Sequence, residues 1–290
     1  MLYKRVDDIV GESKKNFIGL FLIVFVLVML SYIQIYKIYG GKNSPNDYIV
    51  GFNEICNSKY KDIVDYCDID ITGLPGTPDT YTIFFNIIRS DILYHLPIFG
   101  LLLIIVFSLN FVNKLFKSKY LYYYVQRKEY KLFLKKMIIN SYKYVLVIPF
   151  MMALIYLLSL TISTHGQNAL TIAMRAETFD SIAYNTPGFL VLYTINIMLK
   201  WLFFINLGLI MLSKNRKFIF TIIEVYIIYF VLEIIFELLP QYFWIFDFYN
   251  PMTYSIYIYI LVSLIQFIIS FIIVILIYKN KEKILSRIGA

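Results

Sequence analysis

The sequence predicts an all-α integral membrane protein with six transmembrane helices. Of its 290 residues, 60% are hydrophobic and only 16% are charged, whereas an average soluble domain has about 25% charged residues. Six long apolar segments follow one another along the chain, and its 27 tyrosines belong to a residue type enriched at bilayer interfaces. No internal repeat or low-complexity linker divides the sequence, so residues 1–290 are expected to form a single membrane domain.

Each predicted span is a segment of about 20 predominantly apolar residues, the length of helix that crosses about 30 Å of hydrocarbon. Helices are expected because open strands would leave unpaired backbone groups in lipid, and the segments lack the alternating pattern of an outer-membrane barrel. The six segments are Phe17–Tyr36, Leu96–Phe116, Tyr144–Ser163, Gly188–Leu212, Phe218–Leu239 and Tyr254–Tyr278.

The positive charges predict the orientation of these spans. They fall in four blocks, at residues 4–15, 114–143, 214–217 and 279–287, which alternate with the less basic connections along the chain. Because lysine and arginine are retained on the inner side, both termini are expected in the cytoplasm. The net charge of +8 therefore indicates orientation in a membrane and not binding to nucleic acid. The Ile-, Lys- and Asn-rich composition is typical of an AT-rich bacterial genome, so the membrane is expected to be the bacterial plasma membrane.

Two segments outside the spans are predicted to flank the membrane. Residues 1–16 place Leu2, Val6 and Ile9 at helical spacing, which predicts an interfacial helix on the inner surface, with a disordered basic tail as the alternative. Residues 41–94 are expected to form an extracellular loop. It contains Cys56 and Cys67, which either form a disulfide worth roughly 2–3 kcal/mol or remain free thiols.

The cytoplasmic segment 117–136 combines basic and aromatic side chains with no glycine or proline. It is expected to be a helix that inserts bulky side chains into a groove of a soluble partner, or a surface helix that anionic lipids hold through its lysines. The outer segment 240–253 is aromatic, and Pro240, Asn250 and Pro251 break it into short pieces. It predicts either a re-entrant segment or a plain aromatic belt.

A few polar side chains interrupt the apolar spans. Lys200 lies near the middle of the fourth span, where an unpaired lysine costs about 2.5 to 3.5 kcal/mol. Counting about 1.5 Å per residue from the shared inner turn, Glu233 reaches a similar depth, which predicts an ion pair, with Glu237 as the competing acceptor. Snorkelling of Lys200 toward a polar cavity is the alternative. Glu224 is the remaining candidate among the intramembrane polar residues.

The sequence offers no catalytic, metal-binding or cofactor-binding motif. Gly40-Gly41-Lys42-Asn43 lacks the first glycine and the hydroxyl residue of a nucleotide-binding loop. His95 and His165 have no second ligand at metal-binding spacing. The chain is therefore predicted not to be an enzyme, and any ATP and Mg would be bound by a partner subunit.

Several motifs resemble those of the membrane subunits of type-2 ABC exporters, and the resemblance covers the whole length. Leu239-Pro240 and the later Asn250-Pro251-Met252-Thr253-Tyr254 resemble the Leu-Pro and Asn-Pro-hydrophobic-x-Tyr pair of that family. The segment from Gln126 to Tyr130 resembles its Ser-Arg-x-x-Tyr coupling segment. Two details depart from the family pattern: Tyr124-Val125 replaces a preceding Leu-Pro, and Lys135-Lys136 stands one position late for a Gly-Lys pair.

The resemblance implies a permease that dimerises with a second copy or a paralogue, contacts membrane lipid and binds ABC ATPase subunits. The residues it implies at the ATPase contact are Arg127, Lys128, Glu129, Tyr130 and Phe133. The aromatic, apolar spans suggest a hydrophobic or amphipathic substrate, such as an antimicrobial or signalling peptide. The alternative is a membrane-embedded enzyme or an immunity-type membrane protein that acts without an ATPase.

Overall fold

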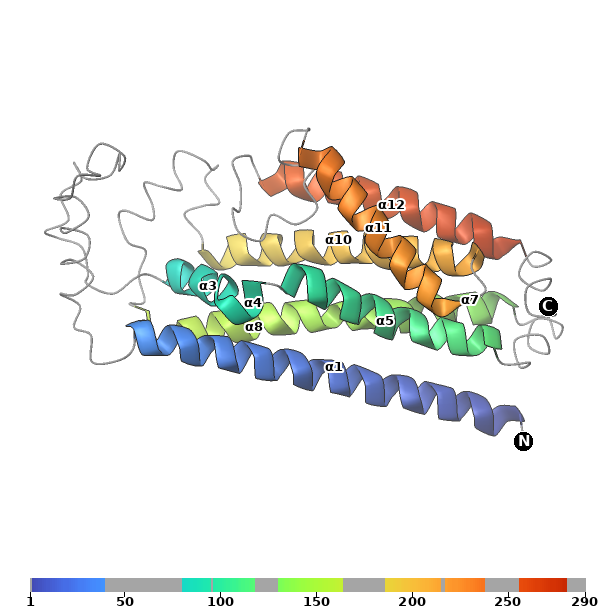
Figure 1. Cartoon of the computed structure of the whole chain (residues 1–290), viewed down its shortest axis with the longest axis horizontal. Helices are drawn as coiled ribbons and strands as arrows, with labels where there is room; N and C mark the ends of the chain where they lie inside the picture. Colours follow the sequence, from blue (N-terminus) through green and yellow to red (C-terminus); the bar gives the residue numbers. More distant parts are fainter. Residues whose placement is uncertain are drawn as a thin grey trace, which may run out of the picture.

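The computed structural model describes residues 2–39, 80–94, 96–117, 130–163, 186–214, 217–237 and 256–280, and within these ranges the chain is helical, with no strand. Most of the long helices run side by side along one axis (Figure 1). The helices are α1 (Leu2–Tyr39), α3 (Thr80–Ile88), α4 (Asp91–Tyr94), α5 (Leu96–Lys117), α7 (Tyr130–Tyr142), η2 (Lys143–Leu146), α8 (Val147–Ser159), α10 (Thr186–Lys214), α11 (Phe218–Glu237) and α12 (Ile256–Lys279).

Five of the described segments are long and apolar enough to cross a membrane: Ser13–Lys37, Gly100–Lys117, Leu134–Ser159, Gly188–Lys214 and Tyr257–Lys279. The all-α membrane class expected from the sequence is thus supported. In α11 the apolar stretch is shorter, Phe218–Leu232. Six spans and a re-entrant outer segment therefore stay predictions, and residues 240–253 lie outside the described part of the chain.

The outer faces of α1, α11 and α12 carry large apolar side chains that no other part of the described chain covers. Leu22 of α1, Ile219 of α11 and Leu276 of α12 are 57%, 62% and 64% exposed. Exposed apolar faces of this extent are not stable in water, because contiguous apolar surface is strongly unfavourable there. They fit a helix bundle whose solvent is lipid.

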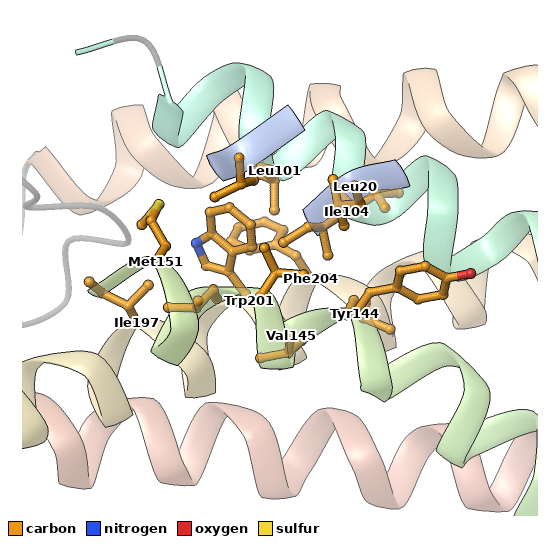
Figure 2. Close-up of a cluster of buried hydrophobic side chains, with 14 of the residues drawn as sticks. Leu20, Leu101, Ile104, Tyr144, Val145, Met151, Ile197, Trp201 and Phe204 are labelled. Carbon is orange, nitrogen blue, oxygen red and sulfur yellow. The ribbon is translucent and has the colours of Figure 1, made fainter. Parts of the chain in front are cut away.

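The core is built around α10, which packs against α12, α5, α11 and α8. Figure 2 shows the centre of this core, where Trp201 and Phe204 of α10 meet Leu101 and Ile104 of α5 and Met151 of α8. The helices α5 and α10 also cross closely at Gly208. A Cβ atom at Gly208 would lie 2.6 Å from Cδ1 of Leu109, so the glycine permits this approach.

The start of the chain differs from the sequence prediction. The segment 1–16 was expected to form a separate interfacial helix, but α1 runs without a break from Leu2 to Tyr39 and is straight in Figure 1. No proline or glycine pair interrupts residues 2–39, so nothing local favours a bend. Residues 2–15 therefore continue the axis of the first span.

The end of the predicted extracellular loop also differs. Residues 80–88 form α3, whose Ile83, Phe84 and Ile87 are fully buried. It packs against α1 and α8, and Tyr81 and Phe85 contact Phe189 and Tyr193 of α10, respectively, with ring centroids 5.7 and 5.6 Å apart. Only residues 41–79 of the 41–94 segment remain candidates for a loop, and they lie outside the described residues.

The third span begins earlier than predicted and contains a break. Its apolar stretch starts at Leu134 in α7, continues through the 3-10 turn η2 and ends in α8. Pro149 has no N–H for the carbonyl of Val145, and its ring crowds that carbonyl, which explains the tighter turn just before it. Residues 130–136, assigned to the cytoplasmic segment from the sequence, therefore belong to the helix that leads into the membrane.

Candidate functional site

Paired polar side chains form a seam between α10 and α12. Ser263 donates a hydrogen bond to Oδ1 of Asn196 at 2.6 Å, and Nδ2 of Asn206 donates to Oγ of Ser270 at 2.9 Å. All four side chains are buried. Because an unsatisfied polar group is costly in lipid, such bonds fix the register of two packed helices. We call these four residues the polar seam.

A third helix joins the polar seam at Asn206. The hydroxyl of Tyr142, at the end of α7, donates to Oδ1 of Asn206, so this amide bridges α7 and α12. The Tyr142 ring also lies against Phe267 and Phe271 of α12, with ring centroids 6.2 and 6.3 Å away. Movement of α7 is thus linked to both α10 and α12.

Lys200 lies between the two pairs of the seam in sequence, and its side chain is only 4% exposed. Its Nζ stands 5.8 Å from the centre of the Tyr259 ring of α12, which suits a cation–π contact. Tyr259 lies nearer the start of α12 than Ser263. The Lys200 side chain can reach it because side chains on a helix point toward the start of that helix. The predicted pair with Glu233 remains untested, because the side chains of Glu233 and Glu237 lie outside the described ones. Glu224 is partly buried on α11.

Four helices meet at Tyr278 of α12, at the end of the bundle that is expected to face the cytoplasm. Its hydroxyl donates to the backbone oxygen of Leu209 in α10 at 2.9 Å, and its ring stacks on Phe116 of α5 with an interplanar angle of 10°. Its own backbone oxygen accepts a hydrogen bond from the hydroxyl of Tyr130, the first residue of α7. We call this group the inner clamp.

The Tyr130 hydroxyl thus bonds within the bundle, while the role of Tyr130 as a docking side chain stays a prediction. Burial raises the pKa of Tyr130 to about 12, so the hydroxyl stays protonated and able to donate at physiological pH. Phe133 lies on α7, but its side chain is not among those described. Arg127, Lys128 and Glu129 lie outside the described residues.

The remaining sequence candidates also lie outside the described residues: Cys56, Cys67, Pro240, Asn250 and Pro251. Within the described part of the chain, no group of three His, Cys, Asp or Glu side chains could hold a metal ion. An apolar pocket of about 350 Å³ lies between α8 and α10, lined by Pro149, Met152, Ala153, Tyr156, Leu190, Val191, Thr194, Ile195 and Met198.

Sequence reasoning overlooked the polar seam and the inner clamp. The signal was present, because Asn196, Asn206, Ser263 and Ser270 are polar residues inside apolar runs, and the two serines stand seven residues apart. That spacing places them on one helix face. Compared with protein-family models, with curated proteins and with solved structures, the chain matches none, so the site has to be interpreted from its own geometry.

Proposed function

We propose that this chain is the membrane-spanning permease subunit of an ATP-driven exporter of the type-2 ABC class, located in a bacterial plasma membrane. The chain carries no nucleotide-binding loop in its sequence, so separate ATPase subunits bind ATP and Mg. A second permease copy or a paralogue completes the transporter. Both chain termini face the cytoplasm, in keeping with the four basic blocks.

The observation that carries the proposal is the inner clamp. The basic segment that resembles the coupling segment of exporters ends at Tyr130, and Tyr130 is bonded to the last residues of α12. A push on residues 118–129 would therefore reach α12 directly, and it would reach α10 through the Tyr278 hydroxyl. Rigid helices joined by such contacts move as bodies, which is how an ATPase drives a membrane domain.

Arg127 and Lys128 are the proposed docking residues, since Tyr130 is used within the bundle. Both would pair with acidic groups on the ATPase, in the way that arginine commonly does at interface centres. The exported substrate is hydrophobic or amphipathic, such as a peptide. The apolar pocket between α8 and α10, which has only Thr194 and Tyr156 as polar lining residues, is compatible with such a substrate.

Co-purification of the tagged full chain from its native membrane tests the proposal. We expect an ATP-binding subunit in a one-to-one ratio with the permease, and an ATPase activity that substrate stimulates. Arg127→Ala with Lys128→Ala should lower the stimulated activity at least tenfold while leaving the permease in the membrane. Lys37→Ala, an exposed basic residue in the last turn of α1, is the control and should have normal activity.

A stable, active chain without an ATPase would overturn the proposal and favour the membrane-embedded enzyme or immunity-type protein. Normal stimulated activity in the Arg127→Ala and Lys128→Ala variant would instead show that another segment receives the push. The two results are distinguishable. The first is read from which subunits the purified complex contains, and the second is read from the rate of ATP hydrolysis.

A further inference from the structure

A half-buried ammonium group lies where η2 packs against α1. Nζ of Lys143 donates to Oγ of Ser13 at 2.6 Å and to Oδ1 of Asn140 at 3.3 Å, and it stands 5.2 Å from the centre of the Tyr144 ring. These partners are all neutral. Among the described side chains, which do not include that of Glu12, the groups that contact the ammonium of Lys143 are dipoles and an aromatic ring.

The groups around Lys143 are held in place by further bonds. Nδ2 of Asn140 donates to the backbone oxygen of Lys136 at 2.9 Å, which directs its Oδ1 toward Lys143. The Tyr144 hydroxyl donates to the backbone oxygen of Ser13 at 3.2 Å, and the Tyr144 ring is fully buried. An ammonium group has three donors. Two have acceptors among the described residues, and the third can bind a ligand oxygen.

A second cation lies one residue from Ser13, which Lys143 contacts. This residue, Lys14, is exposed on α1. Like charges held at one place repel each other and attract an anion that contacts both. An oxyanion with several acceptor oxygens, such as a phosphate, meets this demand better than a halide because it can accept from two ammonium groups together.

The position of the two lysines along the bundle points to a lipid as the source of that anion. Tyr142, the neighbour of Lys143, is linked through Asn206 to Ser270 of α12. From Ser270, α12 continues through the apolar residues Phe271–Tyr278 before Lys279, about 13 Å at 1.5 Å per residue. Lys14 and Lys143, next to α1, thus lie deeper in the membrane than the point where the apolar stretch of α12 ends.

We propose that Lys14 and Lys143 bind the phosphate of an anionic phospholipid of the adjacent leaflet. The phosphate accepts the third donor of Lys143 and a donor of Lys14, and the acyl chains lie along the exposed apolar face of α1, beside Ile18 and Leu22. A lipid drawn inward here thins the bilayer locally, a known response to a short apolar length. It also removes the cost of a cation facing hydrocarbon.

The proposal requires that the chain lies in a bilayer, but it does not require transport or an ATPase. Basic residues near a membrane surface each contribute roughly a fivefold gain in affinity for anionic lipid, from about 1 kcal/mol per residue. The gain in affinity should be more than fivefold for Lys143, because its ammonium group is held in position. Zwitterionic lipids carry the same phosphate with a compensating cation, so they should bind less tightly.

Native mass spectrometry of the purified full chain, titrated with phosphatidylglycerol or phosphatidylcholine, tests the site. We expect one tightly bound phosphatidylglycerol, whose affinity falls at least tenfold in Lys143→Gln and about fivefold in Lys14→Gln. Lys214→Gln, an exposed lysine at the inner end of α10, should bind like wild type. Lys143→Arg keeps the charge and should retain most of the affinity, which guards against a folding defect.

Equal affinity for phosphatidylglycerol and phosphatidylcholine would overturn the proposal. So would equal losses in Lys143→Gln and Lys214→Gln, since that result describes a diffuse basic surface. If soluble glycerol phosphate displaces the lipid at similar concentration, the site binds free phosphate and the lipid assignment is wrong.

Discussion

Two regions of the molecule have opposite chemistry. One is the polar seam between α10 and α12, and the other is the outer faces of α1 and α12. Inside, Asn196, Asn206, Ser263 and Ser270 are buried and hydrogen-bonded to one another. Outside, α12 presents leucine and isoleucine with up to 64% of their surface exposed. A soluble protein arranges these types the other way round. The outward apolar faces fit lipid as the solvent, and the buried polar pairs add hydrogen bonds that favour one register of α10 against α12.

The largest effect is expected from a charge placed on the outer face of α12. Ile268 of α12 is 44% exposed and lies in the middle of that helix. If lipid surrounds it, Ile268→Lys should cost about 2.5 to 3.5 kcal/mol and greatly reduce the fraction of chain that resists alkaline extraction from membranes. Tyr257→Lys, near the end of the same helix and 50% exposed, can snorkel and should insert normally. Equal insertion of both variants would mean that the face meets water.

A second test concerns the close crossing of α5 and α10. Gly208→Phe should destabilise the bundle by about 1–3 kcal/mol, because even a Cβ atom there lies 2.6 Å from Leu109. Gly19→Phe on α1 is the matched control, since no heavy atom lies within 4 Å of its Cβ position. Thermal unfolding in detergent measures both. Similar melting temperatures for the two variants would contradict this packing.

The polar seam itself is tested by Asn206→Leu, which removes the partner of both Tyr142 and Ser270. We expect a loss of about 1–2 kcal/mol, because measured polar contacts in membrane proteins average about 0.6 kcal/mol each and two are lost. Ser31→Ala is the control, since its hydroxyl bonds only within α1, to Leu27. In a double-mutant cycle with Tyr142→Phe, the two losses in the free energy of unfolding should be coupled. Additive losses would mean that Tyr142 and Asn206 do not interact.

The smallest effect is expected at the inner clamp. Tyr130→Phe removes the donor to Tyr278 and should cost about 1 kcal/mol. Because burial raises the pKa of Tyr130 to about 12 from about 10 in the unfolded chain, the unfolded state loses its proton first. Wild-type stability should therefore fall between about pH 10 and pH 12, and less steeply in Tyr130→Phe. If the stability of wild type and of Tyr130→Phe fell equally with pH, Tyr130 would titrate as an exposed tyrosine does.

Much of the fold could be predicted from the sequence because long apolar runs encode spans directly. The boundaries of α5, α10, α11 and α12 agree with their predicted segments to within a few residues. The exceptions have physical causes. The nine residues of α3 are too short for a span, and the lysines of α7 interrupt its apolar pattern, so the start of the third span was assigned too late.

The site was harder to predict, because polar pairs depend on which helices become neighbours. The Tyr259 ring of α12 beside Lys200 was not foreseen, and the pair of Lys200 with Glu233 stays a prediction. For a single asparagine or serine in an apolar run, the sequence does not indicate which residue is its hydrogen-bond partner. The aromatic and basic neighbours of Tyr130 are typical of a docking surface and gave no sign that its hydroxyl also reaches the end of α12.

The most direct test of the account is the side of the membrane on which each chain terminus lies. The apolar stretch of α11 is the shortest of the set, and an odd number of crossings would place the termini on opposite sides. A fluorescent protein that folds only in the cytoplasm, fused separately to each terminus of the full chain, reports this directly. Fluorescence from both fusions is the predicted result. Fluorescence from the N-terminal fusion alone would mean an odd number of crossings. It would contradict the predicted six spans and the cytoplasmic position of the inner clamp, on which the proposed function depends.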